Sequence, residues 1–252
     1  MHSLLKDVPE RKMPIEPDPR DLPPGLAPAW LGGPRPRRGP KPAHTVAEVV
    51  AAAVELADAE GLAAASLPNI AASLGLTTNA LYRYVGSKDE LIALLADAGF
   101  GPPPELPEPD DWRAGVRAWA AAALERYAAR PWLLEVPYRG GGLTPHRLRW
   151  TELLLATLTG AGLSEADALG CAELVTDLAH TTAERRRALS GPDAADSPAE
   201  EVRTFLRPRL ADEGYPHLAG LAEAGHFPAP APNGFALERA LDGIAALLSP
   251  VR

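Results

Sequence analysis

Short polar side chains, two tyrosines and a lysine are gathered in one stretch of the chain, at Thr77, Thr78, Asn79, Tyr82, Tyr84 and Lys88. Hydroxyl and amide groups at the start of a helix can approach base edges or thymine methyl groups, whereas tyrosine hydroxyls and a lysine suit phosphate oxygens. Backbone amides near Ser87 could hold a further phosphate, because a helix amino terminus favours an anion. This chemistry is that of a surface that reads double-stranded DNA.

Two short helices joined at a glycine are needed to present these side chains. The first is expected from Ser66 to Leu74, with Pro68 in its first turn, where a missing donor does no harm. Gly75 can take the left-handed conformation that ends this helix and turns the chain. The second is expected from Thr77 or Thr78 to near Val85, and together they predict a helix-turn-helix.

A helix on each side of this helix-turn-helix completes the predicted DNA-binding domain, residues 43–100, which we call the reading head. Thr45 and Glu48 have the spacing of a capping box and open a helix at about 46–60, which Gly61 ends. A second box, Ser87 to Glu90, opens a helix whose apolar face is formed by Leu91, Leu94, Leu95 and Ala98. The alternative is a helical hairpin without DNA contacts, in which Tyr82 and Tyr84 only cover the hydrophobic core.

The segment from Leu74 to Leu91 resembles the signature of the TetR family of bacterial one-component repressors, and the resemblance covers about 45–92. It implies base or phosphate contacts from Thr77, Thr78, Asn79, Tyr82, Tyr84 and Lys88, and from Ser66 at the start of the preceding helix. Pro68 stands where many members carry a polar or basic side chain, so that contact shifts to Asn69. A looser resemblance to the tetracycline-repressor type of carboxy-terminal domain rests on residues 130–136 and 235–248.

Composition predicts an all-α protein. The chain has 252 residues, 46% of them hydrophobic, with alanine and leucine used heavily. Its net charge of −8 argues against coating nucleic acid with the whole surface. We predict a cytoplasmic protein with no membrane partner. The chain has a single cysteine, Cys171, and it lacks both a long apolar stretch and a signal-peptide core.

Three regions are expected along the chain. Residues 1–42 are rich in proline and predict a disordered arm with a basic end, although Leu26, Trp30 and Leu31 could dock somewhere. Residues 43–100 form the helix-turn-helix domain, and residues 101–252 form a larger helical domain for ligand binding and dimerisation. Its helices are expected at about 111–129, 145–161, 164–189, 198–212 and 234–248 after a stiff proline-rich linker at 101–111.

The basic end of the arm contains Arg35, Arg37, Arg38 and Lys41 with no acidic residue among them. As a flexible arm it could enter a neighbouring minor groove, where the potential is most negative. The alternative is a solvated charge cluster. We favour the arm, because it lies directly before the reading head.

Two long apolar helices, at about 164–189 and 234–248, could pair with their copies in a second subunit as a four-helix interface. A single reading head offers little contact area, so a homodimer on a palindrome is expected. The alternative is packing within one chain. The expected interface residues are Leu169, Ala172, Leu174, Val175 and Leu178 on one helix and Leu237, Leu241, Ile244, Ala245 and Leu248 on the other.

An aromatic group in the second half could line a cavity for a small-molecule effector, or could equally pack the core. It consists of Trp112, Trp119, Tyr127, Trp132, Tyr138, His146 and Trp150. The expected effector residues are Trp119, Trp132, His146, Trp150, Glu173, Asp177, His180 and Thr181. For His180 alone, an ordinary hydrogen-bonded histidine is the simpler reading. A ligand here would change the angle of the helix opened by Ser87, provided that it binds the two states unequally.

Enzymatic motifs are missing from the chain, with no glycine-rich phosphate loop, metal-binding His-Glu-x-x-His or nucleophile elbow. We therefore expect no catalysis, no cofactor and no metal site. The sequence predicts a ligand-responsive DNA-binding transcriptional regulator, a repressor released from a palindromic operator by a small molecule. The alternative is a helical small-molecule-binding protein without DNA activity.

Overall fold

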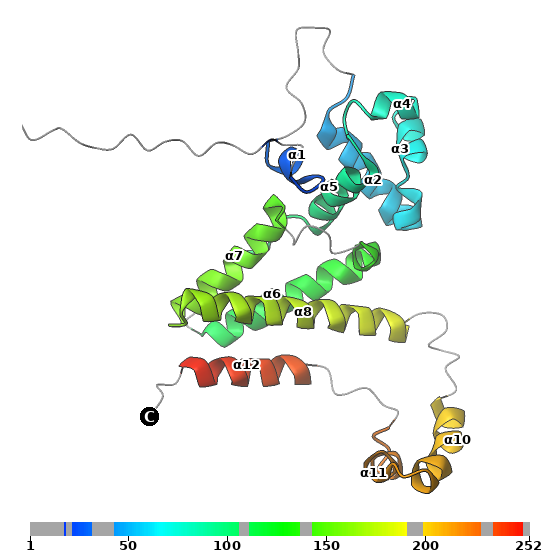
Figure 1. Ribbon diagram of the computed structural model, residues 1–252, viewed down its shortest axis with the longest axis vertical. Helices are drawn as coiled ribbons and strands as arrows, with labels where there is room; N and C mark the ends of the chain where they lie inside the picture. Colours follow the sequence, from blue (N-terminus) through cyan, green and yellow to red (C-terminus); the bar gives the residue numbers. More distant parts are fainter. Residues whose placement is uncertain are drawn as a thin grey trace, which may run out of the picture.

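The computed structural model describes residues 18, 22–31, 43–105, 111–136, 143–190, 199–227 and 234–248. All regular secondary structure in these ranges is helical, as the composition predicts. A small amino-terminal domain lies at one end of the molecule, and a larger helical domain lies below it (Figure 1). The basic residues Arg35, Arg37, Arg38 and Lys41 lie outside the described residues.

The amino-terminal domain contains α2 (Val46–Glu60), the short 3-10 helix η2 (Leu62–Ala64), α3 (Leu67–Ser73), α4 (Thr78–Leu81) and α5 (Lys88–Phe100). The predicted capping box of α2 is present: the Glu48 amide donates to Thr45 Oγ1 at 3.2 Å and the Thr45 amide to the Glu48 carboxylate at 2.6 Å. Gly61 ends α2 with a φ of 87°, and Gly75 turns the chain after α3 with a φ of 67°. The predicted capping box of α2 and the two glycine turns, at Gly61 and Gly75, are therefore confirmed.

One boundary of the reading head was predicted too far along the chain. The helix expected to reach Val85 ends as an α-helix at Leu81, and Tyr82 to Tyr84 continue as turns. The reason is a change of hydrogen bonding: the amide of Tyr84 binds the carbonyl of Leu81, three residues back, at 2.9 Å. Leu81 and Val85 are nevertheless both fully buried, as their spacing predicts.

The larger domain is built around a central helix. Its main elements are α6 (Trp112–Ala129), the 3-10 helix η3 (Pro131–Glu135), α7 (Pro145–Gly160), α8 (Glu165–Ser190) and α12 (Phe235–Leu248). Helix α8 packs against α6, α7 and α12. The predicted helices agree with these bounds to within one residue, whereas η3 was not predicted.

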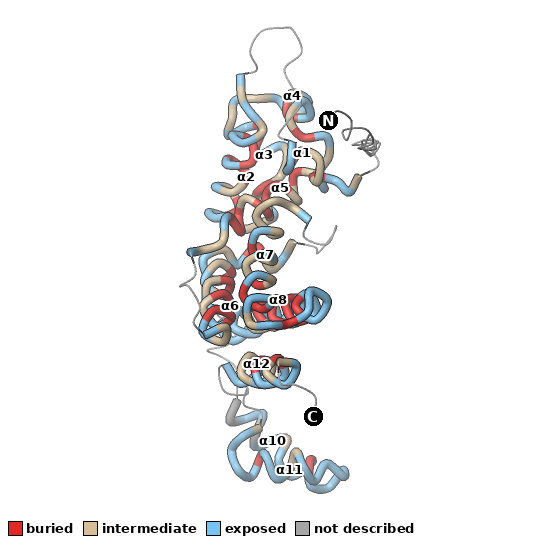
Figure 2. Tube along the Cα trace, turned by 90° about the vertical axis from the view of Figure 1, so that its left-hand side faces the viewer, coloured by how far each residue is buried: buried red, intermediate tan, exposed pale blue. Residues whose placement is uncertain are grey.

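Two further helices form a hairpin that extends away from this body (Figure 1), namely α10 (Ala199–Asp212) and α11 (Pro216–Glu223). Both are mostly exposed, whereas buried positions concentrate in α2, α5, α6 and α8 (Figure 2). Helix α11 was not among the helices expected from the sequence.

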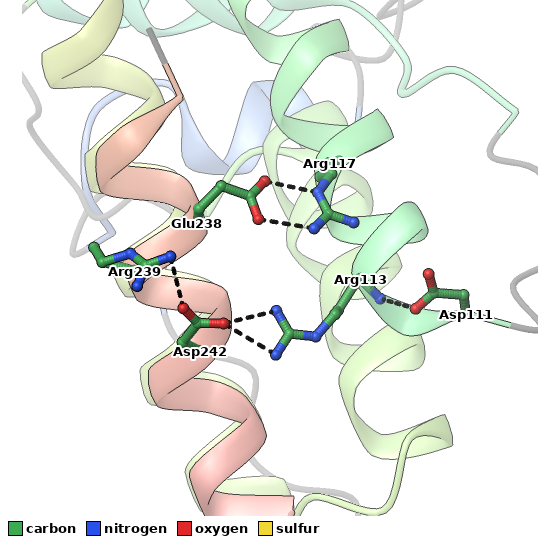
Figure 3. A network of polar contacts seen from close by, with 6 residues as sticks. All are labelled: Asp111, Arg113, Arg117, Glu238, Arg239 and Asp242. Carbon is green, nitrogen blue, oxygen red and sulfur yellow. Dashed lines mark hydrogen bonds and ion pairs between the residues drawn. The ribbon is translucent and has the colours of Figure 1, made fainter. Parts of the chain in front are cut away.

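Helix α12 is joined to α6 by ion pairs (Figure 3). Arg117 donates two hydrogen bonds of 2.8 Å to the Glu238 carboxylate, and Arg113 donates two of 3.2 Å to Asp242. The hydrogen bond from Arg117 lowers the pKa of Glu238, and the same contact raises the pKa of Arg117. Leu241 and Ile244 of α12 are buried beneath these pairs, so polar and apolar contacts together hold α12 within its own chain.

The proline-rich arm is partly ordered, which corrects the prediction of a disordered region at 1–42. Helix α1 (Leu26–Leu31) packs against α5. We call residues 22–31 the N-terminal strap. Gly25 has a φ of +83°, and a Cβ there would lie 2.5 Å from the Cβ of Ala93 on α5. The Trp30 indole donates to the carbonyl of Leu143 at 2.9 Å, so the strap bridges both domains.

None of the described helices is long and apolar enough to cross a membrane. Cys171 on α8 is a free, buried cysteine, and burial raises the pKa of its thiol, with a smaller contribution from Asp167. Among the described residues, no group of three or more histidine, cysteine or acidic side chains could hold a metal ion.

Candidate functional site

The side chains predicted to contact DNA lie around α4, at the outer end of the molecule (Figure 1). Thr77 and Asn79 are exposed, Thr78 is half-buried, and Tyr82 is 49% exposed. The Thr77 hydroxyl also accepts from the amide of Ala80 at 3.2 Å and so fixes the start of α4. Because Leu81 and Val85 are buried on the opposite side, α4 presents its polar side chains outward.

The start of α3 contributes less free polar surface. The Ser66 hydroxyl accepts from the amide of Asn69 at 3.4 Å, and the Asn69 side-chain amide donates to the carbonyl of Ala64 at 3.0 Å. Both residues therefore serve the cap of α3, although Asn69 stays exposed. Pro68 is exposed beside them and offers no donor.

Two further predicted contacts lie at the edges of this surface. Tyr84 is half-buried, and its ring meets the edge of His44 with 6.5 Å between ring centroids. Lys88 is exposed at the first position of α5, where Ser87 caps the helix by accepting from the amide of Glu90 at 3.0 Å. This helix start combines an exposed positive side chain with the positive end of the helix dipole, an arrangement suited to a phosphate.

A cavity of about 340 Å³ lies between the two domains. One long wall is a stripe along α5, and the N-terminal strap supplies another through Pro23, Pro24 and Leu26. Residues of α6, η3, α7 and α8 line the rest of the cavity, which is partly open to solvent. The volume falls within the range of about 300–1,000 Å³ that is usual for small-molecule sites.

Three polar side chains from three helices meet at this cavity, namely Tyr127 of α6, Arg147 of α7 and His180 of α8. An Arg147 Nη is 3.5 Å from the Tyr127 hydroxyl, and the guanidinium lies 4.4 Å above the ring of Phe100. The rings of Tyr127 and His180 meet edge to face at 5.5 Å. His180 also lies 3.8 Å from Glu184. The arrangement offers hydrogen-bond donors at one end of an apolar space.

The three tryptophans expected at the effector site are buried in the core and do not line this cavity. The Trp119 indole donates to the carbonyl of Trp150 at 2.9 Å, and the Trp150 indole donates to that of Gly101 at 2.9 Å. The Trp132 indole donates to the Asp58 carboxylate at 2.7 Å. Since each indole N–H is satisfied within the protein, these residues build the scaffold behind the cavity.

The remaining expected residues separate into three groups. Glu173, Asp177 and Thr181 are exposed on the outer side of α8. His146 lies at the start of α7, with its Nδ1 3.2 Å from the Asp97 carboxylate. Of the expected set, His180 alone lines the cavity described above.

Tyr127 belongs to the aromatic group that was expected to line a cavity, and it lines this one, whereas Arg147 was not singled out and no motif in the sequence marks it. Their role depends on which sides of α6 and α7 face α5, which is a property of the packing.

The two domains are joined at two polar contacts. The buried Asp97 carboxylate of α5 accepts from the backbone amides of His146 at 3.0 Å and Arg147 at 3.3 Å. On the other side, Arg130 donates to both Asp58 oxygens at 3.1 Å and to the carbonyl of Gly99 at 2.8 Å. Both α2 and α5 are therefore tied to the larger domain.

Some of the residues expected at a dimer interface are buried in the core of the chain, and others are exposed on its surface. Ala172, Val175, Leu241 and Ile244 are buried within the chain. Leu169 and Leu174 of α8 remain 46% and 47% exposed, and Leu247 of α12 is 56% exposed. The surface that is left for a second subunit is thus narrower than the predicted one.

Comparison with known proteins agrees with this architecture. Residues 49–95 match the family described as bacterial regulatory proteins, tetR family, and residues 103–248 match the tetracyclin repressor-like C-terminal domain. The chain is 36% identical over 234 residues to the HTH-type transcriptional repressor DrrR1 of Streptomyces coeruleorubidus, covering 88% of this chain and 85% of that protein.

Solved structures show the same fold at lower identity. ActR of Streptomyces coelicolor in complex with actinorhodin has a TM-score of 0.66 at 24% identity, covering 82% of this chain and 96% of that chain. BioQ with its double-stranded DNA operator has a TM-score of 0.55 at 20% identity, covering 81% and 99%. With a helix-turn-helix at one end, a walled cavity behind it and matches to both family domains, the chain belongs to the TetR family of DNA-binding transcriptional regulators.

Proposed function

We propose that the protein is a repressor that binds a palindromic operator as a homodimer and leaves it when a small molecule occupies the cavity. The observation that supports DNA reading best is the outward position of Thr77, Asn79 and Tyr82 around α4. Further DNA contacts at the edges of this surface come from Thr78, Tyr84, Lys88 and the start of α3. The similarity to DrrR1, which is named a repressor, favours repression over activation.

The cavity supports a response to a ligand, because α5 contributes both to the DNA-binding domain and to the lining of the cavity. Its amino terminus adjoins the reading head, while one side of it lines the cavity. A molecule between α5 and α7 would alter the angle of α5 only if it binds the released state more tightly than the DNA-bound state. ActR, which shares the fold, has been solved with actinorhodin bound. We therefore propose that the protein works in the cytoplasm, where a bacterial operator lies.

A gel shift with DNA from around its own gene tests DNA binding directly. Selection of bound sequences from random DNA then gives the half-site and its spacing. A palindrome is expected, with half-sites about one helical turn apart or a multiple of it. A wild-type protein that shifts no fragment, or that selects no common sequence, would contradict the proposal and favour the alternative of a ligand-binding protein without DNA activity.

Dimerisation is tested on the exposed leucines of α8. Leu169→Glu with Leu174→Glu places two charges on the surface proposed for the second subunit and is expected to give a monomer in sedimentation at micromolar concentration. Arg186→Gln, exposed near the carboxyl end of the same helix and more than three turns from Leu174, is the control and should leave the dimer intact. A wild-type protein that sediments as a monomer would refute this part.

A further inference from the structure

We propose that the effector of this cavity is an elongated, largely apolar molecule with one anionic group, and that Arg147 binds that group with Tyr127 and His180 beside it. The inference rests on the cavity being the effector site and adds the chemical class of the effector. Neither of the two family matches nor the relatives assign this role to Arg147.

The shape of the cavity follows α5. The helix lines it through Lys88 and Asp89 at one end, then Ile92, Ala93 and Ala96, and Phe100 at the other end. Positions three and four apart lie on one side of a helix, so these residues form a continuous stripe. From Asp89 to Phe100 the helix rises roughly 16 Å, at about 1.5 Å per residue. The ligand that fills this space is therefore long and narrow.

The walls facing the middle of the stripe are apolar. Leu26 and the two prolines of the N-terminal strap lie on one side, and Leu133 and Val136 of the η3 segment lie on another. Strap and α5 are in close contact at Gly25, so the strap forms a wall of the cavity itself. An apolar body would gain roughly 25 cal/mol for each Å² that it removes from water there.

Arg147 differs from four other arginines of this domain in having no carboxylate partner. Arg113, Arg117, Arg130 and Arg187 each bind a carboxylate, on Asp242, Glu238, Asp58 and Glu135 respectively. Within the described part of the chain, Arg147 has no carboxylate within 4.0 Å, and its one side-chain hydrogen bond is the 3.5 Å contact with Tyr127. A guanidinium has five N–H donors, so most of them are available to a ligand.

The cavity contains one carboxylate, Asp89, which must be considered as an internal partner. Arg147 stacks on Phe100, and Asp89 lies at the opposite end of the stripe, roughly 16 Å away along the helix axis at about 1.5 Å per residue. Asp89 therefore does not pair with Arg147, and the nearby Asp97 carboxylate binds the backbone amides of His146 and Arg147 and not the guanidinium. A planar carboxylate or a similar anion suits the fork of a guanidinium, and the Tyr127 hydroxyl and the His180 ring can donate further hydrogen bonds.

The test uses two dyes with the same fused-ring body, the anionic 1-anilinonaphthalene-8-sulfonate and the neutral N-phenyl-1-naphthylamine. Fluorescence titration of the full chain should show that they compete for one saturable site and that the anion binds more tightly. Arg147→Gln should weaken the anionic dye about tenfold or more, because a hydrogen bond to a charged group contributes at least that much. The neutral dye should bind as before.

Matched variants make the result specific. Arg147→Lys keeps a positive charge and should retain part of the preference for the anion, whereas Arg149→Gln removes an exposed arginine from the same helix and should change nothing. Circular dichroism melting checks that each variant is folded. Failure of the dyes to compete, equal weakening of both dyes by Arg147→Gln, or no change with either dye would overturn the proposal.

A gel shift on the same samples separates this inference from the proposed function. Arg147→Gln is expected to bind the anionic dye more weakly than the wild type does and to bind DNA as the wild type does. A wild-type protein that binds no DNA would refute the regulator, while the dye titrations would still decide the ligand class.

Discussion

The Asp97 carboxylate of α5 accepts a 3.0 Å hydrogen bond from the backbone amide of His146, the second residue of α7. The first amides of a helix lack partners within the helix, and here a carboxylate from another domain supplies one. Thr144, which precedes α7, makes no side-chain cap of its own. The first turn of α7 is thus completed by a side chain of α5, the last helix of the amino-terminal domain.

Asp97→Ala is expected to destabilise the protein by about 2 kcal/mol, because it leaves two backbone amides of α7 without this partner in a partly buried place. Urea denaturation at fixed protein concentration measures the loss. Asp177→Ala removes an exposed aspartate from α8 and serves as the control, with a change of less than about 0.5 kcal/mol. Equal effects of the two substitutions would show that the contact across the domains contributes nothing.

Gly99→Ala is expected to destabilise the protein although alanine favours helix by roughly 1 kcal/mol over glycine. A Cβ at Gly99 would lie 2.2 Å from the Trp132 ring, which is itself held by Asp58, so the joint between the domains would have to open. We expect a net loss of about 1–3 kcal/mol, which is usual for overpacking. Thermal melting gives the sign of the change.

The matched control for that substitution is Gly220→Ala, because Gly220 lies within α11 and a Cβ there would meet nothing within 4 Å. Alanine should stabilise the protein slightly at this position. A stabilising effect at both glycines would contradict the close approach of α5 to Trp132.

Asn79→Ala should weaken operator binding by about 1–3 kcal/mol and relax the preference at one position of each half-site, because an exposed amide on α4 can form a bidentate contact with a base. Titration of labelled operator and of single-base variants measures both effects. Asn69→Ala is the comparison: its side chain is bound to the carbonyl of Ala64, so the substitution should act on α3 and spare base preference. Unaltered specificity in Asn79→Ala would remove Asn79 from the reading surface.

Replacing Arg35, Arg37 and Arg38 together with glutamine should lower operator affinity and flatten its dependence on salt. Each phosphate contact that is lost reduces the slope of log K against log salt by roughly 0.9. Binding measured from low to moderate salt gives this slope. A triple variant with the wild-type slope would mean that the basic cluster is solvated and makes no contact with DNA.

Glu238 links stability to pH. The hydrogen bond from Arg117 lowers the pKa of this carboxyl in the folded protein, so the contact stabilises the fold above the pKa of the unfolded chain and is lost as pH falls through the folded value. Glu238→Gln should therefore lower stability at neutral pH by a small amount, since the pair is exposed to solvent. The difference from wild type should vanish in acid, as urea denaturation across pH would show. A difference that persists in acid would contradict this linkage.

The reading head could be predicted from the sequence because its signals are local. Capping residues, the glycine at position 75 and the four-residue spacing of Leu81 and Val85 each act within a few residues of the chain. The end of α4 was predicted too late, because apolar spacing does not distinguish α-helical from 3-10 hydrogen bonding over a single turn.

The effector cavity could not be predicted in the same way, because it depends on how helices face one another. Trp119 and Trp150 are large and aromatic, yet their indole donors bind backbone carbonyls, whereas Tyr127, from the same group of aromatic residues, lines the cavity. Asp97 did carry one: it follows Leu94 by three positions on an otherwise apolar side of α5. An acidic residue at a buried helical position requires a partner.

The N-terminal strap lies outside both stretches of the chain that match the family domains. It nevertheless forms a wall of the cavity and is fastened to the larger domain through Trp30. A protein shortened to the matched stretches would lack the wall that Pro23, Pro24 and Leu26 supply. Libraries of candidate ligands should therefore be screened against a chain that keeps residues 22–31, since truncation would remove part of the surface on which selectivity depends.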